Sequence, residues 1–278
     1  MGLDYGINNS YGKISNRQSF EVLSLAFSSG INILDTAEVY GNSHQIIGKF
    51  HYNHPNSKFK IITKLPHDIK THKIESKVFE YLKVLRVEKI ETLMFHSFDD
   101  FKNNIIAIEL LNSLKSDGYI NNIGVSVYTN NQIEFLIDKD SIDVVQLPFN
   151  LLDNIRVRGE LIKKLKESKK IVHSRSAFLQ GLFFKKIDEN NNIVRELNKE
   201  LILLNNIKSK LGCTMEELAL SYCINQKLID NVIIGVDSLG HLNANLKATQ
   251  FKLPSKFKIE IDNINVKNLK LLNPSSWN

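Results

Sequence analysis

Short apolar runs alternate along the chain with stretches in which apolar residues recur every three or four positions. An apolar run bounded by glycine or polar residues predicts a buried strand, and the longer spacing predicts an amphipathic helix. Their alternation predicts strand–helix units around a parallel sheet. We expect seven strands, which end at Asp35, Lys64, His96, Tyr128, Leu147, Ser176 and Val236.

Local capping patterns mark where several helices begin and end. Ser15 and Gln18 form a capping box that opens a helix, and Gly30 is placed to end it. A second capping box is expected at 214–217, and Pro148 must end its strand because it lacks the ladder donor. Further helices are expected from about Ser43 and over 74–84, 103–114, 132–136 and 157–168. A long helix is expected to end at Leu211, and others begin at Leu239 and Pro254, followed by a tail over 271–278.

The order of these elements favours a barrel over a nucleotide-binding doubly wound sheet. No predicted strand is followed by GxGxxG, the dinucleotide fingerprint of the doubly wound fold. The chain has 278 residues, 42% of them hydrophobic, and no low-complexity linker. We therefore expect one α/β domain over 1–278, a TIM (β/α)8 barrel, in which functional groups lie at the C-terminal ends of the strands.

Three predicted strands end in residues that suit acid–base chemistry. Asp35, Lys64 and His96 close their strands, and Tyr40 follows within the segment DTAEVYG. A phenol is a weak acid at neutral pH, but a neighbouring ammonium lowers its pKa, and an imidazole can orient a carbonyl. Taken alone, Asp35 and Tyr40 would more often be a turn cap and a half-buried surface ring. Convergence of the strand ends in a barrel favours a tuned proton donor instead.

Four residues on successive strands, in this order, resemble the catalytic tetrad of the aldo-keto reductases: Asp35, Tyr40, Lys64 and His96. DTAEVYG stands almost as that family writes it, and later segments of the family are similar to 124–128, 146–150, 174–181 and 235–245. The resemblance implies reduction of an aldehyde or ketone by a nicotinamide cofactor, with Tyr40 protonating the oxygen. It also implies that Lys64 lowers the pKa of this phenol and that Asp35 holds Lys64. His96 would orient the carbonyl.

The same resemblance assigns residues to the cofactor. Ser126 and Gln146 would hold the nicotinamide carboxamide, and Arg175 would lie against the nicotinamide ring. Val127 stands where many members have asparagine, so one amide contact lacks its usual residue. The loop over the pyrophosphate would be shaped by Ser176, Leu179, Gln180 and Gly181, and the phosphate and adenine end would be contacted by Gly235, Ser238, His241 and Asn245. Ordinary strand-end hydrogen bonding is the alternative for Ser126, Gln146 and Ser176.

NADP(H) is the expected cofactor, with NAD(H) as the alternative. Gly235 and His241 stand where many NADPH-using members place lysine and arginine. Asp237 would repel a 2′-phosphate or accept a ribose hydroxyl, while His241 and Lys247 would partly compensate. The resemblance therefore favours NADP(H) only slightly.

A small-molecule carbonyl is the expected substrate, and its pocket would be built from loops whose chemistry the sequence does not specify. Similarity to bacterial members associated with surface-polysaccharide sugars implies a sugar or sugar-nucleotide carbonyl. Two other functions stay open. One is a non-redox barrel isomerase or hydrolase that uses Lys64 and His96, and the other is a reductase-like barrel kept as a binding or regulatory protein. Nothing in the sequence indicates an oligomeric state.

Charge and cysteine content restrict the partners and the compartment. The net charge of +6 is spread along the chain, so we expect a solvated surface and no nucleic-acid partner. Without a long apolar stretch or a leader, no membrane partner is expected. Cys213 and Cys223 form no CxxC pair, which predicts reduced thiols in the cytoplasm and no metal site. His51 and His54 lie in a polar segment and predict a surface loop.

The start of the chain differs from the family pattern. Relatives generally begin with a glycine-rich strand that forms the first stave of the barrel, whereas here Met1 and Gly2 lead straight into Leu3. We therefore expect the barrel to lack its first strand, through a misassigned start or a real deletion. Such a gap exposes two strand edges and leaves interior side chains unpacked, which would weaken folding and cofactor binding.

Overall fold

The computed structural model describes residues 14–185 and 191–277. Within them, 14–146 and 236–242 form one compact unit, and 147–235 and 243–277 form a second. Each unit is described by itself, and a single domain over 1–278 stays a prediction. The expected absence of a first strand concerns residues 1–13, which lie outside the described residues.

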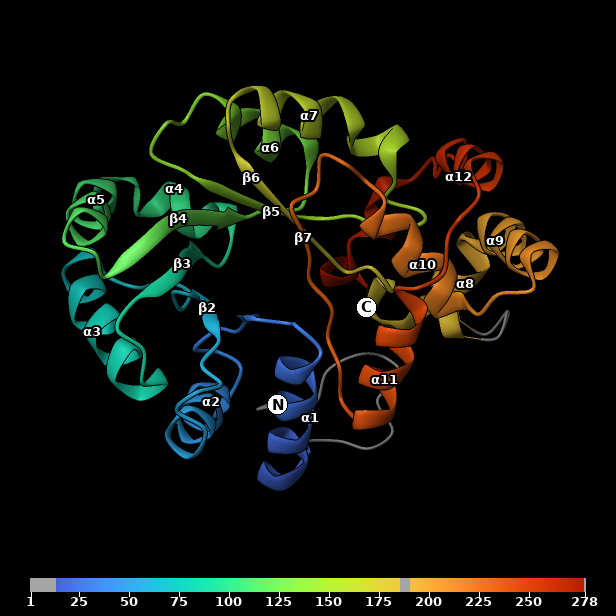
Figure 1. Cartoon of the computed structure of the whole chain (residues 1–278). Coiled ribbons are helices and arrows are strands. Elements are labelled where there is room, and N and C mark those ends of the chain that lie inside the picture. The colour runs from blue at the N-terminus through green and yellow to red at the C-terminus, as the bar shows by residue number, and fades with distance from the viewer. Residues whose placement is uncertain (1–13, 186–190, 278) are drawn as a thin grey trace. The chain divides into compact units, whose positions relative to one another are not determined.

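Parallel strands in sequential order form the centre of the first unit. The strands are β1 (Ile33–Asp35), β2 (Lys60–Lys64), β3 (Ile90–Phe95), β4 (Ile120–Ser126) and the first residues of β5 (Val144–Pro148). The helices are α1 (Asn16–Ser28), α2 (Ser43–Asn53), α3 (Ile74–Leu85), α4 (Phe98–Asn103), α5 (Ile108–Ser116) and α6 (Asn130–Ile137), with 3-10 turns η1 (Thr71–Lys73) and η2 (Ile105–Ala107). Figure 1 shows α2, α3 and α5 on the outer side of β2, β3 and β4.

The register of the strands separates two faces of this sheet. Asp35 pairs with Ile62, Lys64 with Met94, and Ser126 with Gln146. Because side chains alternate along a strand, these partners and their second neighbours share one face. The intervening positions carry the other face, which is mainly apolar and buried: Ile61, Thr63, Leu93, Phe95, Ile123, Val125 and Val145. The polar strand-end residues therefore project from the face that the apolar layer does not use.

The predicted ends of α1 are confirmed. The Ser15 capping box is present, and Gly30 follows the helix end with a φ of +85°.

Helix packing in this unit depends on close contacts. Phe20 of α1 meets Phe50 of α2 edge to face, with ring centroids 5.7 Å apart. A Cβ on Gly48 would lie 1.8 Å from a backbone carbonyl oxygen of α3. The approach of α2 to α3 therefore requires glycine.

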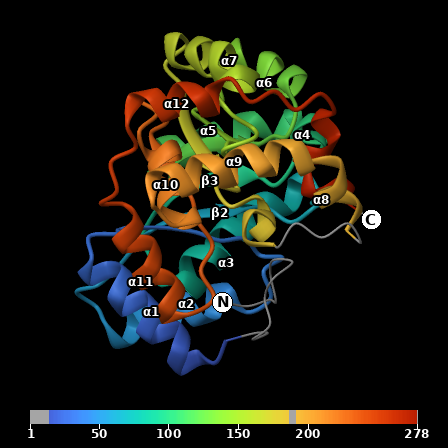
Figure 2. The same cartoon turned by 90° about the vertical axis from the view of Figure 1, so that its right-hand side faces the viewer.

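The second unit contains the end of β5 and two further parallel strands. These are β6 (Ile171–Arg175) and β7 (Asn231–Val232), with His173 paired to Asn231. The helices are α7 (Ile155–Glu167), α8 (Asn192–Glu196), α9 (Asn198–Leu211), α10 (Met215–Ile224) and α12 (Ser255–Asp262), with 3-10 segments η3 (Leu179–Phe184), η4 (Leu269–Leu272) and η5 (Pro274–Ser276). Helix α11 (Leu239–Ala248) begins in the first unit's residues and ends in the second's. Gly212, with a φ of +61°, ends α9, and α10 is the next helix along the chain. Both helices are labelled in Figure 2.

All seven predicted strands are present in the described residues, although β4 ends at Ser126 rather than Tyr128 and β7 ends at Val232 rather than Val236. The continuous helix predicted over 103–114 is wrong, because the chain breaks at Asn104 between α4 and η2. The side-chain amide of Asn104 donates to the carbonyl oxygen of Asp100 at 3.0 Å, so it competes with the helical backbone. The predicted long helix ending at Leu211 is two helices, α8 and α9.

The predicted surface loop at His51 and His54 is also wrong. His51 is a buried residue of α2, and His54 caps that helix. The Nδ1 atom of His51 is 2.8 Å from the carbonyl oxygen of Leu85, and its Nε2 accepts from the backbone N–H of Phe59 at 3.2 Å. Burial lowers the pKa of His51, so the ring is a neutral link between α2, α3 and the entry to β2.

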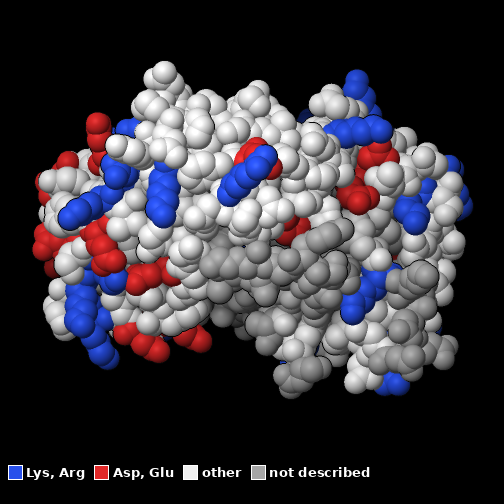
Figure 3. Space-filling model, turned by 90° about the horizontal axis from the view of Figure 1, so that it is seen from below, with Lys and Arg blue, Asp and Glu red and all other residues white. Residues whose placement is uncertain are grey.

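Charge is mixed on one face of the molecule. On the face drawn in Figure 3, lysine and arginine side chains lie among acidic ones, and the described residues there form no continuous basic area. Among the helices in the described part of the chain, none has the length and apolar character needed to cross a membrane.

Candidate active site

A buried ion pair joins the ends of β1 and β2. The ammonium of Lys64 donates to one carboxylate oxygen of Asp35 and, at 3.3 Å, to the carbonyl oxygen of Thr36. The side chain of Lys64 is 3% exposed and that of Asp35 is 12% exposed. Removal of either partner would leave a buried charge without compensation, which is strongly unfavourable.

Gln146 of β5 completes the surroundings of Asp35. Its amide nitrogen donates to the second carboxylate oxygen of Asp35 at 2.8 Å. Gln146 is 1% exposed, and the same nitrogen is 3.8 Å from the sulfur of Met94. Both oxygens of Asp35 therefore have donors, one from the neighbouring strand β2 and one from β5, which is not adjacent to β1.

Tyr40 lies next to this pair. The ammonium of Lys64 is 5.5 Å from the centroid of the Tyr40 ring. The ring meets that of His96 edge to face, with centroids 5.9 Å apart and an interplanar angle of 83°. The structure thus brings all four residues predicted as catalytic into one cluster within the first unit.

His96 is neutral at physiological pH. Burial, reinforced by the charge of Lys64, lowers the pKa of His96 to about 4. Its Nδ1 atom is buried and has no hydrogen-bond partner among the described residues. The Nε2 atom is therefore the nitrogen left to form a hydrogen bond with a small molecule.

A second imidazole lies against His96, and the sequence analysis did not single it out. The ring of His67 stacks on that of His96, with centroids 4.6 Å apart and an interplanar angle of 24°. Its Nδ1 atom is 2.7 Å from a carboxylate oxygen of Asp100. His67 stands three positions after Lys64, so its nearness to that strand end was the available signal.

The segment that carries Tyr40 is held by a polar cluster that was also missed. Glu38 accepts hydrogen bonds from the hydroxyl of Tyr81 and, at 2.7 Å, from the ammonium of Lys77, both on α3. Burial alone would raise the pKa of Glu38, but these two donors outweigh it and lower the pKa. His44 of α2 lies against Tyr81 with ring centroids 5.0 Å apart. Glu38 therefore links the DTAEVYG segment to α3.

The cofactor residues predicted in the first unit occupy two places. Ser126 and Gln146 are register partners on neighbouring strands, and both are buried. Ser238 precedes α11 and accepts from the backbone N–H of His241 at 3.1 Å. The Nδ1 atom of His241 is hydrogen-bonded to a carboxylate oxygen of Asp237. This pairing holds the His241 ring against the carboxylate of Asp237.

The cofactor residues predicted in the second unit include an unusual backbone segment. Left-handed φ values occur in the segment after β6, at Ser176 (61°), Leu179 (45°), Gln180 (53°) and Gly181 (91°). Such conformations are rare outside glycine, concentrate at ligand-binding sites, and can orient successive N–H groups toward an anion. Arg175 ends β6 and its guanidinium is 3.3 Å from the hydroxyl of Ser176. Asn245 is buried, and a Cβ on Gly235 would meet no atom within 4 Å. The N–H groups of Leu179 and Gly181 already donate to the carbonyl oxygens of Ser176 and Phe178, both at 2.9 Å, so contact of this loop with a pyrophosphate stays a prediction.

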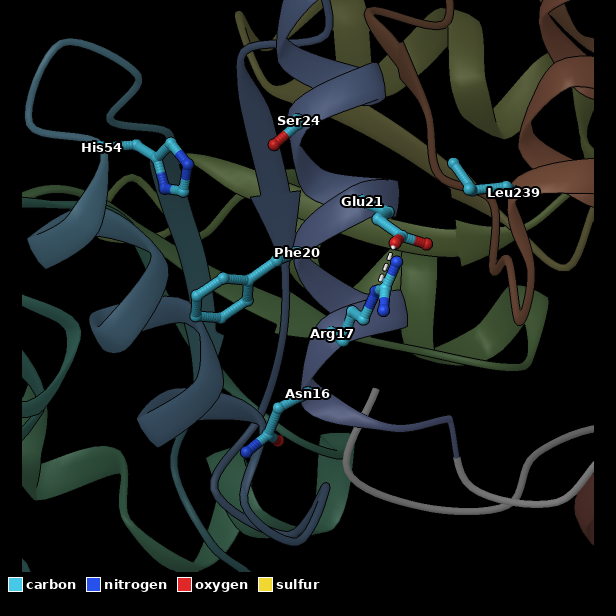
Figure 4. A pocket seen from close by; sticks show the side chains of 7 residues that line it. All are labelled: Asn16, Arg17, Phe20, Glu21, Ser24, His54 and Leu239. Carbon is cyan, nitrogen blue, oxygen red and sulfur yellow. Dashed lines mark hydrogen bonds and ion pairs between the residues drawn. The ribbon is translucent and has the colours of Figure 1, made fainter.

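A cavity of about 670 Å³ lies elsewhere in the first unit (Figure 4). It is lined by Asn16, Arg17, Phe20, Glu21, Ser24, His54 and Leu239. Arg17 and Glu21 form a 3.1 Å ion pair across one turn of α1, and the Arg17 side chain is 90% exposed. Exposed pairs of this kind contribute little stability. None of the charged side chains that line this cavity is buried, in contrast to Lys64 in the cluster of Asp35, Tyr40, Lys64 and His96.

Comparison with known proteins agrees with this geometry. Residues 4–266 match the profile of the Aldo/keto reductase family. The chain is 25% identical over 253 residues to the uncharacterized oxidoreductase YqkF of Bacillus subtilis, which covers 83% of this chain and 82% of that protein. It is 22% identical over 280 residues to the NADH-specific methylglyoxal reductase of Escherichia coli, covering 87% and 86%.

A solved structure extends the comparison to the fold. The chain is similar to the holo form of the aldo-keto reductase AKR11C1 from Bacillus halodurans, with a TM-score of 0.74 and 24% identity over 95% of this chain and 91% of that one. The seven parallel strands of the described residues, with their intervening helices, agree with the (β/α)8 barrel of such enzymes. The chain therefore belongs to the aldo/keto reductase family, and the predicted fold class is confirmed.

Proposed function

We propose that this protein reduces an aldehyde or ketone to an alcohol with a nicotinamide cofactor, and that Tyr40 is the general acid. The observation that supports the proposal is the buried charge arrangement beside the phenol. Lys64, held by Asp35, has its ammonium 5.5 Å from the Tyr40 ring centroid, and His96 meets the same ring edge to face. Family membership supports oxidoreductase chemistry.

The chain's own residues handle the proton and the oxygen. The nicotinamide, when bound, would supply a hydride to the carbonyl carbon. The Tyr40 hydroxyl gives its proton to the carbonyl oxygen, and the ammonium of Lys64 stabilises the phenolate that remains. Asp35 holds the ammonium of Lys64 in place through their ion pair. The neutral His96 donates from Nε2 to the same oxygen and stabilises the charge that develops on it.

Replacement of Tyr40 by phenylalanine tests this role. The variant keeps the ring and removes the proton donor, so turnover should fall by about 10² to 10⁴ while cofactor binding is retained. Oxidation of NAD(P)H at 340 nm with a panel of carbonyl compounds measures turnover, and quenching of protein fluorescence measures binding. Tyr52→Phe is the matched control, because that side chain lies on α2 and is 67% exposed. Turnover of Tyr40→Phe within about threefold of wild type would refute the assignment.

Cofactor preference and substrate class belong to the same proposal. We infer a slight preference for NADP(H), which the pairing of His241 with Asp237 works against. The ratio of kcat/KM for NADPH and NADH measures the preference, and more than about tenfold in favour of NADH contradicts it. A sugar or sugar-nucleotide carbonyl is the proposed substrate. Quenching of protein fluorescence by NAD(P)H without turnover of any carbonyl compound would instead indicate a binding or regulatory protein.

A further inference from the structure

His96 lacks the hydrogen bond that usually orients a functional imidazole. The ring of such a histidine is commonly held by a hydrogen bond between its second nitrogen and a carboxylate or a backbone carbonyl oxygen. The Nδ1 atom of His96 is buried and has no hydrogen-bond partner among the described residues. Packing against neighbouring side chains must therefore hold this ring in the orientation that the proposed chemistry requires.

Two ring contacts of His96 are present in the described part of the chain. Tyr40 meets it edge to face, with centroids 5.9 Å apart. His67 is closer, with centroids 4.6 Å apart and an interplanar angle of 24°, so these two imidazoles are stacked. Both arrangements are favourable between aromatic rings. The stack with His67 therefore opposes rotation of the His96 ring out of its plane.

His67 is itself fixed, although its side chain is 53% exposed. Its Nδ1 atom is 2.7 Å from one carboxylate oxygen of Asp100, and the backbone N–H of Asp68 donates to the other oxygen at 3.4 Å. Asp100 is buried and accepts a 2.6 Å hydrogen bond from the hydroxyl of Ser97, which caps α4. Asp100 thus holds both the ring of His67 and the backbone that follows it.

We propose that His67 is a positioning residue, whose ring, held by Asp100, fixes the plane of His96 for the hydrogen bond to the carbonyl oxygen. The inference rests on the proposed carbonyl reduction and adds a residue to it. A hydrogen bond weakens steeply when its donor turns away from the acceptor. Freedom of His96 to rotate would therefore lower kcat, because this hydrogen bond acts most strongly as charge develops on the oxygen.

Two substitutions of His67 separate the stacked ring from the hydrogen bond to Asp100. His67→Asn keeps an amide nitrogen near the place of Nδ1 and removes the ring, whereas His67→Phe keeps a flat ring and removes the donor. With the carbonyl compound that wild type reduces fastest, kcat should fall by about fivefold to tenfold in His67→Asn and by less than about threefold in His67→Phe. Both variants should melt within about 2 °C of wild type, because the side chain is half exposed.

NMR spectra of the cofactor-free protein measure the ring contact without turnover. The ring protons of His96, assigned by their absence from His96→Gln, experience the ring current of the stacked imidazole. Their resonances should move further in His67→Asn than in His67→Phe. His72→Asn is the matched control, because His72 is an exposed histidine of η1, and it should leave kcat and these resonances unchanged.

Several results would overturn the inference and leave carbonyl reduction standing. One is wild-type kcat in His67→Asn, and another is a loss in His67→Phe as large as that in His67→Asn, which would show that the nitrogen and not the ring matters. A third is an unchanged His96 spectrum in His67→Asn. If wild type reduces no carbonyl compound, the proposed function falls and this inference falls with it.

Discussion

Replacement of Gln146 by methionine separates two roles that this residue could have. The family resemblance assigns Gln146 to the carboxamide of the cofactor, whereas in the structure its amide nitrogen donates to Asp35 at 2.8 Å. Methionine is similar in length and flexibility but cannot donate. If Gln146 holds Asp35, the change lowers the melting temperature of the cofactor-free protein. If Gln146 contacts only the cofactor, that melting temperature stays the same.

The size of the effect follows from burial and charge. A hydrogen bond to a charged group contributes about 1.5–3 kcal/mol, and here Gln146 is buried while the side chain of Asp35 is 12% exposed. Methionine would also leave one oxygen of Asp35 without this donor. At about 2 °C per kcal/mol for a chain of this size, the melting temperature of the cofactor-free protein should fall by about 3–6 °C. Because Asp35 positions Lys64, kcat should fall as well.

Thermal unfolding of the cofactor-free protein, followed by circular dichroism, measures the change. Gln226→Met is the matched control. Gln226 is also buried, but its amide donates to an uncharged acceptor, the carbonyl oxygen of Tyr222, at 3.1 Å. A neutral hydrogen bond contributes about 0.5–1.5 kcal/mol, so the control should lose less stability. If Gln146→Met unfolds at the wild-type temperature and only binds NAD(P)H more weakly, its role in holding Asp35 is refuted.

Three further changes test the packing around the cluster. Gly48→Ala should prevent stable folding, because the new Cβ would lie 1.8 Å from a backbone oxygen of α3, whereas Gly240→Ala, with its nearest atom at 3.7 Å, should keep the wild-type melting temperature or raise it. Tyr81→Phe removes a donor to Glu38, whose side chain is 32% exposed, so we expect a loss of about 1 kcal/mol in urea unfolding and a lower kcat. Burial lowers the pKa of His44 to about 4, while in the unfolded chain it is about 6.5. The unfolded state therefore binds more protons between these values, and stability should fall as pH drops from about 6.5 to 4, with a smaller slope in His44→Gln.

Local sequence patterns determined much of the fold. The seven apolar runs became strands, and the capping boxes at Ser15 and Thr214 began helices where predicted, because such signals depend on residues within one helical turn. Patterns failed where distant groups intervened. Asn104 broke a predicted helix through side-chain hydrogen bonds, one of them with Thr71 at 3.3 Å. His51 is buried because α3 supplies a carbonyl oxygen to its ring.

The sequence by itself determined which residues end the strands: an acid, a lysine and an imidazole, with a phenol close behind the acid. Only the tertiary structure decided how they meet. The strand register places Asp35, Lys64 and Gln146 on one face. It brings Gln146 within hydrogen-bonding distance of Asp35 although 111 positions separate them. Stacking of His67 on His96 likewise depends on the path of a loop. Propensity and periodicity act over a few residues, whereas these contacts depend on how strands far apart in the chain align, which no local pattern encodes.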